Sequence, residues 1–255
     1  MNSKSWLIIA ILLSLFGCAQ KPSRDVVLDD QVKPILTTKK LIKKAQQAIN
    51  AGEFRNADPL LQQLNSASRT STETLQLNLL TLQYALKNKD VDQSEQILNQ
   101  IDRGQLNKSK QSLQIQYGLL KAEFYELSGQ FLTAARERDF LSAILSGDTQ
   151  ATNHKKIWQN LINISRDNLL KWSTAAPNTQ FSNWLELAAI AKNPRFTLEE
   201  HIQAVNAWQQ ANPRHPAGIK LPGGLSLLSQ SMKEQPKHIA LMLPLSGNLA
   251  SSGKA

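Results

Sequence analysis

The amino-acid sequence predicts a mostly α-helical fold, a solenoid of helical hairpins, followed by the first strand of a truncated α/β domain. Apolar residues recur at three- and four-residue steps from residue 40 onward, which is the spacing of one helix face. The same hairpin pattern returns at Phe54, Val91 and Phe131, 37 and 40 residues apart. Only 11 glycines and 10 prolines interrupt the 255 residues, which also favours helix over sheet.

The N-terminal segment has the pattern of a lipoprotein signal. Lys4 precedes an apolar run at 6–16 that is too short to span a bilayer, and Gly17 is followed by Cys18, the only cysteine. This arrangement resembles a bacterial lipoprotein signal peptide at 1–17, after which the Cys18 thiol is acylated and becomes the mature N-terminus. A plain signal peptide followed by an incidental cysteine is the alternative.

The residues after Cys18 bear on the membrane to which the lipid is attached. Ala19 and Gln20 include no aspartate, and in the sorting rule of enteric-type bacteria this sequence resembles a signal for the outer membrane. No other apolar run reaches the 18 or so residues that a membrane span needs. Segment 18–38, with Pro22 and Pro34 and few regularly spaced apolar positions, is predicted to be a lipidated tether.

Composition limits the partners and the chemistry. A single cysteine excludes a disulfide framework and a thiol-based zinc site. The net charge of +9 favours anionic partners, but the basic residues are spread along the chain, which is typical of a solvated surface. Because the signal directs export, nucleic acid is not expected as a partner.

Segment 39–147 is predicted to form three hairpins of two helices each. The helix patterns cover 40–49 and 54–64, then 75–86 and 91–101, then 113–127 and 131–141. The first and third hairpins resemble a tetratricopeptide repeat through two sets of marker residues: Ala45, Gly52, Phe54 and Ala57, and Ala122, Gly129, Phe131 and Ala134. The middle hairpin has the same spacing but replaces these marker residues with Leu82, Lys89, Val91 and Ser94.

Segment 148–235 is predicted to continue the solenoid as a Trp-rich helical section. It contains four of the five tryptophans, and aromatic residues at helical spacing are more often core than binding site. Helix patterns begin at Asn153, Phe181 and Leu198, with further apolar residues near Leu169. Segment 236–255 then changes character, because the compact apolar run at 238–243 reads as a strand buried on both faces.

No candidate catalytic, cofactor-binding or metal-ligating residue emerges from the sequence. The four histidines are widely separated, and no nucleophile elbow, phosphate loop or zinc signature is present. Glu199 and Glu200 at a helix start are explained by the helix dipole. The chain is therefore not expected to be an enzyme or to need a cofactor, and Cys18 is its one predicted site.

The order of these segments resembles the outer-membrane lipoprotein activators of class A penicillin-binding proteins. Three stretches carry the resemblance: Trp184-Leu185-x-Leu187-Ala188-x-Ile190-Ala191-Lys192, Asn212-Pro213-x-His215-Pro216-Ala217, and Leu243-Pro244-Leu245-Ser246-Gly247. The resemblance implies a lipid-anchored protein on the periplasmic side of the outer membrane. Such a protein reaches to an inner-membrane class A penicillin-binding protein and stimulates peptidoglycan synthesis, with peptidoglycan as a further candidate partner.

The same resemblance implies that the main contact with the synthase lies in a C-terminal domain similar to type I periplasmic binding proteins. Only the first residues of such a domain, from Lys237, are present in this sequence. Two other readings stay open at this point. One is a general repeat-type docking lipoprotein for another envelope machine, and the other is a lytic transglycosylase, in which a helical superhelix precedes a catalytic module.

Overall fold

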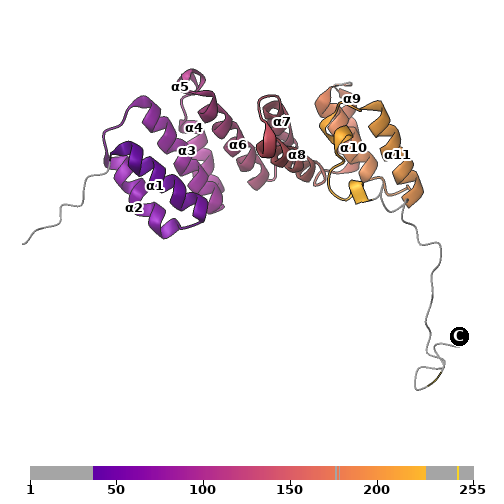
Figure 1. Ribbon diagram of the computed structural model, residues 1–255, viewed down its shortest axis with the longest axis horizontal. Coiled ribbons are helices and arrows are strands. Elements are labelled where there is room, and N and C mark those ends of the chain that lie inside the picture. Colours follow the sequence, from indigo (N-terminus) through magenta and orange to yellow (C-terminus); the bar gives the residue numbers. More distant parts are fainter. Residues whose placement is uncertain (1–36, 176, 178, 228–245, 247–255) are drawn as a thin grey trace, which may run out of the picture. The chain divides into compact units, whose positions relative to one another are not determined.

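A computed structural model describes residues 37–175, 177, 179–227 and 246 (Figure 1). Over these residues the fold is α-helical, as the sequence predicts. The helices are α1 (Thr38–Ala51), α2 (Phe54–Ser66), α3 (Ser71–Lys87), α4 (Val91–Gln100), α5 (Arg103–Lys108), α6 (Gln111–Leu127), α7 (Phe131–Ser142), α8 (Gly147–Leu161), α9 (Arg166–Ala175), α10 (Gln180–Ala191), α11 (Leu198–Ala211) and α12 (Pro216–Ile219).

Three hairpins, α1–α2, α3–α4 and α6–α7, turn in the same way. The turn residues Gly52, Lys89 and Gly129 all have left-handed backbones, with φ of 74°, 59° and 73°. In each turn the next N–H donates to the carbonyl five residues earlier, at 2.8–2.9 Å: Glu53 to Ala48, Asp90 to Ala85 and Gln130 to Tyr125. This bond closes a Schellman-type helix end. The three-hairpin frame predicted from the sequence is confirmed, including the middle hairpin in which lysine replaces glycine.

Small residues occupy one equivalent, buried position in the three return helices. Ala57, Ser94 and Ala134 lie at the same position in the three return helices, and all are fully buried. Seven residues before each turn lie Ala45, Leu82 and Ala122, also fully buried. The repeat markers are therefore packing residues, and the middle hairpin buries the larger Leu82 where the other two have alanine.

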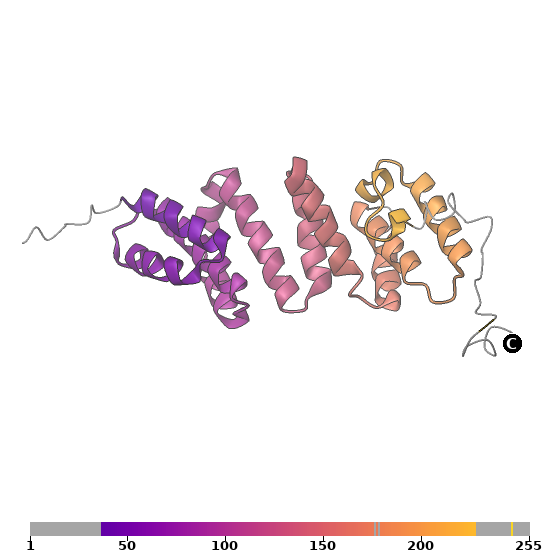
Figure 2. The ribbon, with the colours of Figure 1, turned by 60° about the horizontal axis from the view of Figure 1, so that its bottom comes forward.

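The hairpins pack on one another in chain order. Helix α1 packs against α3, and α3 packs against α6, while each return helix contacts the first helix of the following hairpin (Figure 2). The buried side chains of α3, α4, α5 and α6 form one core. A second core is formed by residues from α7 to α12. Nearest-neighbour packing of this kind is the architecture of a helical solenoid.

Helix α5 was not anticipated by the sequence reading, which left 102–112 without an element. Asp102 caps it, since its carboxylate accepts hydrogen bonds from the N–H groups of Gly104 at 2.8 Å and Gln105 at 3.3 Å. Leu106 is its one buried apolar residue, so the segment carries no helical periodicity. This extra helix lies between the second and third hairpins, which are separated by the longer of the two repeat intervals.

The Trp-rich section begins earlier than the pattern from Asn153 suggested. Helix α8 starts at Gly147, with Asp148 in its first turn, and packs against α7 along its length. Trp158, Trp184 and Trp208 are buried in the second core, which confirms the prediction that these aromatic residues are core. Helical packing therefore runs across residue 147, and a domain division at 147/148 stays a prediction.

The segment that links α11 to α12 is held by a close backbone approach. A Cβ atom on Gly218 would lie 2.0 Å from the carbonyl oxygen of Asn212, so only glycine fits at this position. His215 caps α12, because its Nδ1 accepts a hydrogen bond from the N–H of Ala217 at 3.1 Å. The Asn212-Pro213-x-His215-Pro216 sequence thus encodes a tight turn against the second core.

Several predictions fall outside the described residues. They are the signal peptide at 1–17, the lipidated Cys18, all but the end of the tether at 18–38, and the strand at 238–243 of the segment 236–255. These remain predictions from the sequence.

Candidate functional site

A buried arginine lies at the centre of helices α6, α7 and α8. Arg138 is 6% exposed and belongs to the buried face of α7, which otherwise consists of Ala134, Ala135, Leu141 and Ser142. A charged side chain at a core position needs hydrogen-bond partners, because burying an unpaired charge costs several kcal/mol. Two neighbouring side chains, those of Glu126 and Asn153, meet this need.

Arg138 is held in one orientation by bonds to two helices. Its Nε donates to Oε1 of Glu126 on α6, and its Nη1 donates to Oδ1 of Asn153 on α8 at 3.3 Å. The Asn153 amide nitrogen in turn donates to the carbonyl oxygen of Arg138 at 2.8 Å and to Ser142 Oγ at 3.0 Å. Among the described residues, no acceptor lies within hydrogen-bonding distance of the remaining terminal nitrogen, Nη2.

Glu126 is the shared anion of the cluster. Besides Arg138 it accepts from Asn160 Nδ2 at 2.8 Å and pairs with Lys156 Nζ at 3.3 Å. Burial by itself would raise the pKa of Glu126, but the hydrogen bond and the charge of Arg138, with Asn160 and Lys156, outweigh it and lower the pKa. Glu126 is therefore ionised at neutral pH and compensates the buried guanidinium.

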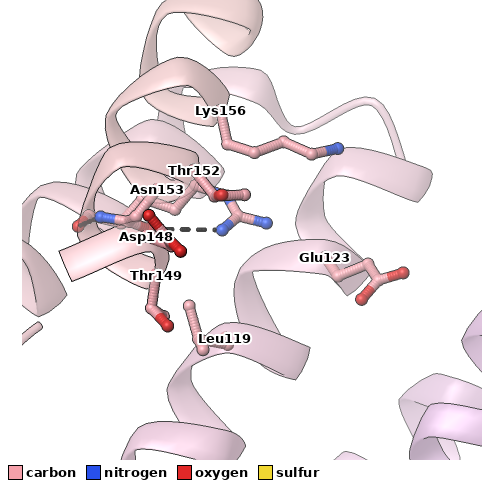
Figure 3. Close-up of a pocket in the computed structure, with 8 residues that line it drawn as sticks. Leu119, Glu123, Asp148, Thr149, Thr152, Asn153 and Lys156 are labelled. Carbon is pink, nitrogen blue, oxygen red and sulfur yellow. Dashed lines mark hydrogen bonds between the residues drawn. The ribbon is translucent and has the colours of Figure 1, made fainter. Parts of the chain in front are cut away.

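A cavity of about 350 Å³ opens beside this cluster (Figure 3). Leu119 and Glu123 of α6 line one side, five residues of α8 line the other, and Arg138 of α7 completes the lining. The α8 residues are Asp148, Thr149, Thr152, Asn153 and Lys156.

The cavity presents both signs of charge. Glu123 and Asp148 have no cationic side chain within 4.0 Å in the described part of the chain, whereas the guanidinium and ammonium groups of Arg138 and Lys156 already share Glu126. The free polar groups are thus one guanidinium edge, two carboxylates and the hydroxyls of Thr149 and Thr152. These groups can donate and accept hydrogen bonds but include no nucleophile–base pair.

A second, larger cavity of about 660 Å³ lies between α8, α10 and the segment after α12. Trp158 and Trp184 contribute aromatic walls, and Lys155 and Lys220 are also among its lining residues. Gly223 packs closely against Trp158, since a Cβ atom on Gly223 would lie 2.9 Å from the indole nitrogen of Trp158. Trp158 and Trp184 therefore belong to the second core and also line this cavity.

The structure brings no predicted site residue together with another. Cys18 lies outside the described residues. His154 and His215 both approach the Trp184 ring, at 6.1 and 4.8 Å between centroids, whereas His201 contacts Phe196. No group of three or more metal-ligating side chains gathers within the described ranges. None of the described helices combines the length and the apolar character that a bilayer crossing requires.

Sequence reasoning missed the Arg138 cluster, although a signal for it exists. Positions 134, 135, 138, 141 and 142 follow the three- and four-residue steps of a buried helix face, and a charged residue occupies the middle of that series. A charge at a core position of an amphipathic helix indicates a partner on a neighbouring helix. The partner itself could not be named, because Glu126 and Asn153 approach Arg138 only through packing.

The family of the chain is shown by comparison with known proteins. Residues 30–255 match the model of the family described as "LppC putative lipoprotein". The chain belongs to the LppC lipoprotein family. This confirms the resemblance seen in the sequence, which rested on the Trp184, Asn212 and Leu243 stretches.

Curated proteins similar to this LppC family member carry the name penicillin-binding protein activator LpoA. The LpoA of Vibrio cholerae is 26% identical over 263 residues, covering 96% of this chain and 43% of the relative. The LpoA of Photobacterium profundum is 29% identical over 222 residues, covering 87% of this chain and 34% of the relative. The chain thus spans less than half the length of the curated relatives it matches.

Solved LpoA structures share the fold. Haemophilus influenzae LpoA superimposes with a TM-score of 0.69 at 20% identity, covering 85% of this chain and 39% of that protein. The isolated N-terminal domain of the same protein gives 0.63 at 20% identity, covering 75% of this chain and 84% of the domain. The LppC family member described here therefore has the fold of an LpoA N-terminal domain.

Proposed function

We propose that the chain is part of a non-catalytic outer-membrane lipoprotein that regulates peptidoglycan synthesis by stimulating a class A penicillin-binding protein. The observation that carries this proposal is the family match over residues 30–255, together with relatives that are named as activators of penicillin-binding proteins.

In the proposed mechanism, successive segments of the chain have different roles. Acyl chains on Cys18 hold one end at the periplasmic side of the outer membrane, because lipid chains anchor without spanning. Segment 18–38 and the hairpins supply distance, and the activating contact with the inner-membrane synthase lies mainly in the C-terminal domain that begins near residue 236. The hairpins also offer packed helix surfaces on which a partner can dock.

The test is in-cell cross-linking, in a Gram-negative host, of the chain together with the domain proposed to begin near residue 236, followed by identification of the captured proteins. Capture of a class A penicillin-binding protein supports the proposal. Capture of secretion or outer-membrane assembly components without any such synthase favours the general docking lipoprotein instead.

A Cys18→Ser variant tests the anchor in the same cells. It should lose incorporation of radiolabelled palmitate and leave the outer-membrane fraction, because no thiol remains to be acylated. Ser14→Ala, which changes a residue inside the signal and keeps Cys18, is the matched control and should stay in the membrane. Retention of the Cys18→Ser protein in the outer membrane would contradict the lipid anchor.

A further inference from the structure

The Arg138 cavity has the mixed polarity of a site for a zwitterion. One of its sides offers a guanidinium edge, and the lining also includes two carboxylates that have no cationic partner within 4.0 Å among the described residues. We propose that this cavity binds a zwitterionic amino acid group, in which an ammonium and a carboxylate share one carbon atom. Arg138 receives the carboxylate, and Asp148 receives the ammonium.

Arg138 is preorganised to receive a carboxylate. Its side chain is more than nine-tenths buried and its Nε and Nη1 are bonded to Glu126 and Asn153, so the guanidinium plane is fixed before any ligand arrives. Nη2 is the donor left over, and a charge-assisted hydrogen bond from a fixed guanidinium costs little side-chain entropy. Lys156 Nζ, beside the same Glu126, adds a second positive charge near the cavity.

The carboxylate side suits an ammonium group. Asp148 comes from the first turn of α8 and lies beside Asn153 and Thr149 in Figure 3, whereas the Glu123 carboxylate on α6 extends away from these residues. An ammonium has three donors and no acceptor, and the Asp148 carboxylate with the Thr149 hydroxyl supplies acceptors for it.

A ligand of one charge fits this lining less well. A simple anion would face the carboxylate of Asp148, and a simple cation would face the guanidinium of Arg138. A zwitterion satisfies both and adds no net charge to the cavity. A volume of about 350 Å³ is at the lower end of ordinary ligand sites, which matches a small group better than an extended chain.

Two sources carry this chemistry. One is a free amino acid, and the other is a diamino acid in a cell-wall stem peptide, whose side chain ends in a free amino acid group. The second source rests on the proposed role in peptidoglycan synthesis, whereas the chemistry of the cavity does not.

The experiment is an NMR titration of the full chain, which follows the Nε–H signal of Arg138 and the side-chain amide of Asn153. Glycine is the probe, and glycinamide and N-acetylglycine, which each lack one of the two charges, are the controls. We expect glycine to shift both signals in a saturable manner with a Kd of about 1 mM or below, and each control to bind about tenfold more weakly or worse. The proposal is wrong if glycine causes no saturable shift, or if both singly charged controls bind as well as glycine.

Substitution at the rim assigns the binding to this cavity without disturbing the buried cluster. Asp148→Asn should weaken glycine binding about tenfold, because it removes one acceptor of the ammonium. Asp167→Asn is the matched control, since Asp167 occupies the first turn of α9 and does not line the cavity. Equal binding by the Asp148→Asn and Asp167→Asn proteins would show that the zwitterion binds elsewhere.

A second titration separates the two sources. The probe is a stem tripeptide that ends in meso-diaminopimelate, compared with the same peptide acetylated on its side-chain amino group. Binding of the free tripeptide about tenfold tighter than glycine, lost on acetylation, identifies the cell-wall source, and equal binding identifies a free amino acid. Failure of every probe would overturn the cavity proposal while leaving synthase capture unaffected, so the two proposals fail separately.

Discussion

At the scale of single residues, His215 shows how the second core fixes one protonation state. The ring lies between Trp184, at 4.8 Å between centroids, and Trp208, at 5.2 Å. Nδ1 accepts from the N–H of Ala217, so Nε2 carries the proton and donates it to the carbonyl of Gln180 at 3.1 Å. The pKa of His215 is lowered to about 4: burial is the main cause, the Gln180 carbonyl opposes the shift, and the nearby His154 adds to it.

This shift predicts a loss of stability in mild acid. An unfolded histidine has a pKa near 6.5. Between about pH 6.5 and pH 4, His215 is therefore protonated in the unfolded state but neutral in the folded state. His215 thus contributes its full stability above pH 6.5 and loses it as the pH falls. We expect about 2 kcal/mol of the unfolding free energy to disappear between pH 6.5 and pH 5, measured by urea denaturation.

His215→Asn keeps an acceptor for the Ala217 N–H and removes the titrating ring, so its stability should depend less on pH over the same range. Some dependence should remain, because burial also lowers the pKa of His154. His201→Asn, on α11 and outside this aromatic cluster, serves as the control and should keep the wild-type slope. The same pH slope for the His215→Asn and wild-type proteins would be inconsistent with this assignment.

At this scale, the sequence predicts which residues are buried better than it predicts which side chains they contact. Trp158, Trp184 and Trp208 lie in the core, as their helical spacing predicts, whereas Trp172 is half-buried against it. The acylation of Cys18 stays a prediction from the sequence. The hydrogen bond between Arg138 and Glu126 could not be predicted from the sequence. The two residues are twelve positions apart on different helices, α7 and α6, and only the packing of these helices brings them together. Sequence spacing shows which residue is buried, but not which side chain it meets.

At the scale of elements, the α3–α4 turn has the geometry of its neighbours without their glycine. Lys89 has a φ of 59° and is exposed, whereas Gly52 and Gly129 occupy the equivalent places. A side chain in the left-handed region costs about 1 kcal/mol, and glycine avoids that cost. Lys89→Gly should therefore raise the unfolding free energy by about 0.5–1 kcal/mol, measured by denaturant unfolding.

Lys87→Gly is the matched control for this substitution. Lys87 is exposed two residues earlier and ends α3 with an ordinary helical backbone, so glycine there should lower stability by about 0.5–1 kcal/mol. The opposite signs of the two lysine-to-glycine changes isolate the backbone effect. A destabilised Lys89→Gly protein would count against strain at this turn.

The elements were predictable where their patterns were long and were missed where they were short. Helices α1 to α4, α6 and α7 repeat apolar residues over several turns, and the Gly52 and Gly129 turns fixed the frame in which Lys89 could be placed. Helix α5 has six residues and one buried apolar side chain, which is too little for periodicity to reveal. The start of α8 was missed because its first turn is polar and exposed.

At the scale of the whole molecule, the hairpins form a series in which each one packs on its neighbours. Removal of residues 54–90 deletes one repeat and joins Glu53 to Val91, which restores the frame of turn and return helix. Because stability in such an array is a sum of local terms, the remaining hairpins should stay folded. If distance is the variable that matters, stimulation of the synthase should fall in a chain that also carries the domain after residue 236.

Circular dichroism and a transpeptidase assay would measure these two outcomes on the same protein. A retained helical spectrum with reduced stimulation is the expected combination. A folded deletion protein that stimulates the synthase as well as the intact chain would rule out the spacer role. Deletion of 21–36 from the tether is a useful comparison, since it removes length without removing a hairpin.

The turn geometry also bears on how this family varies in length over evolution. The turns inside the hairpins require a left-handed residue and a fixed pair of hydrogen bonds, so an inserted residue would break the helix pairing. The connections between hairpins carry no such requirement: 67–70 is short, whereas 101–110 contains all of α5. Insertions and deletions among homologues should therefore accumulate between hairpins, and these connections are the places where a label or an epitope can be inserted without disturbing the repeat.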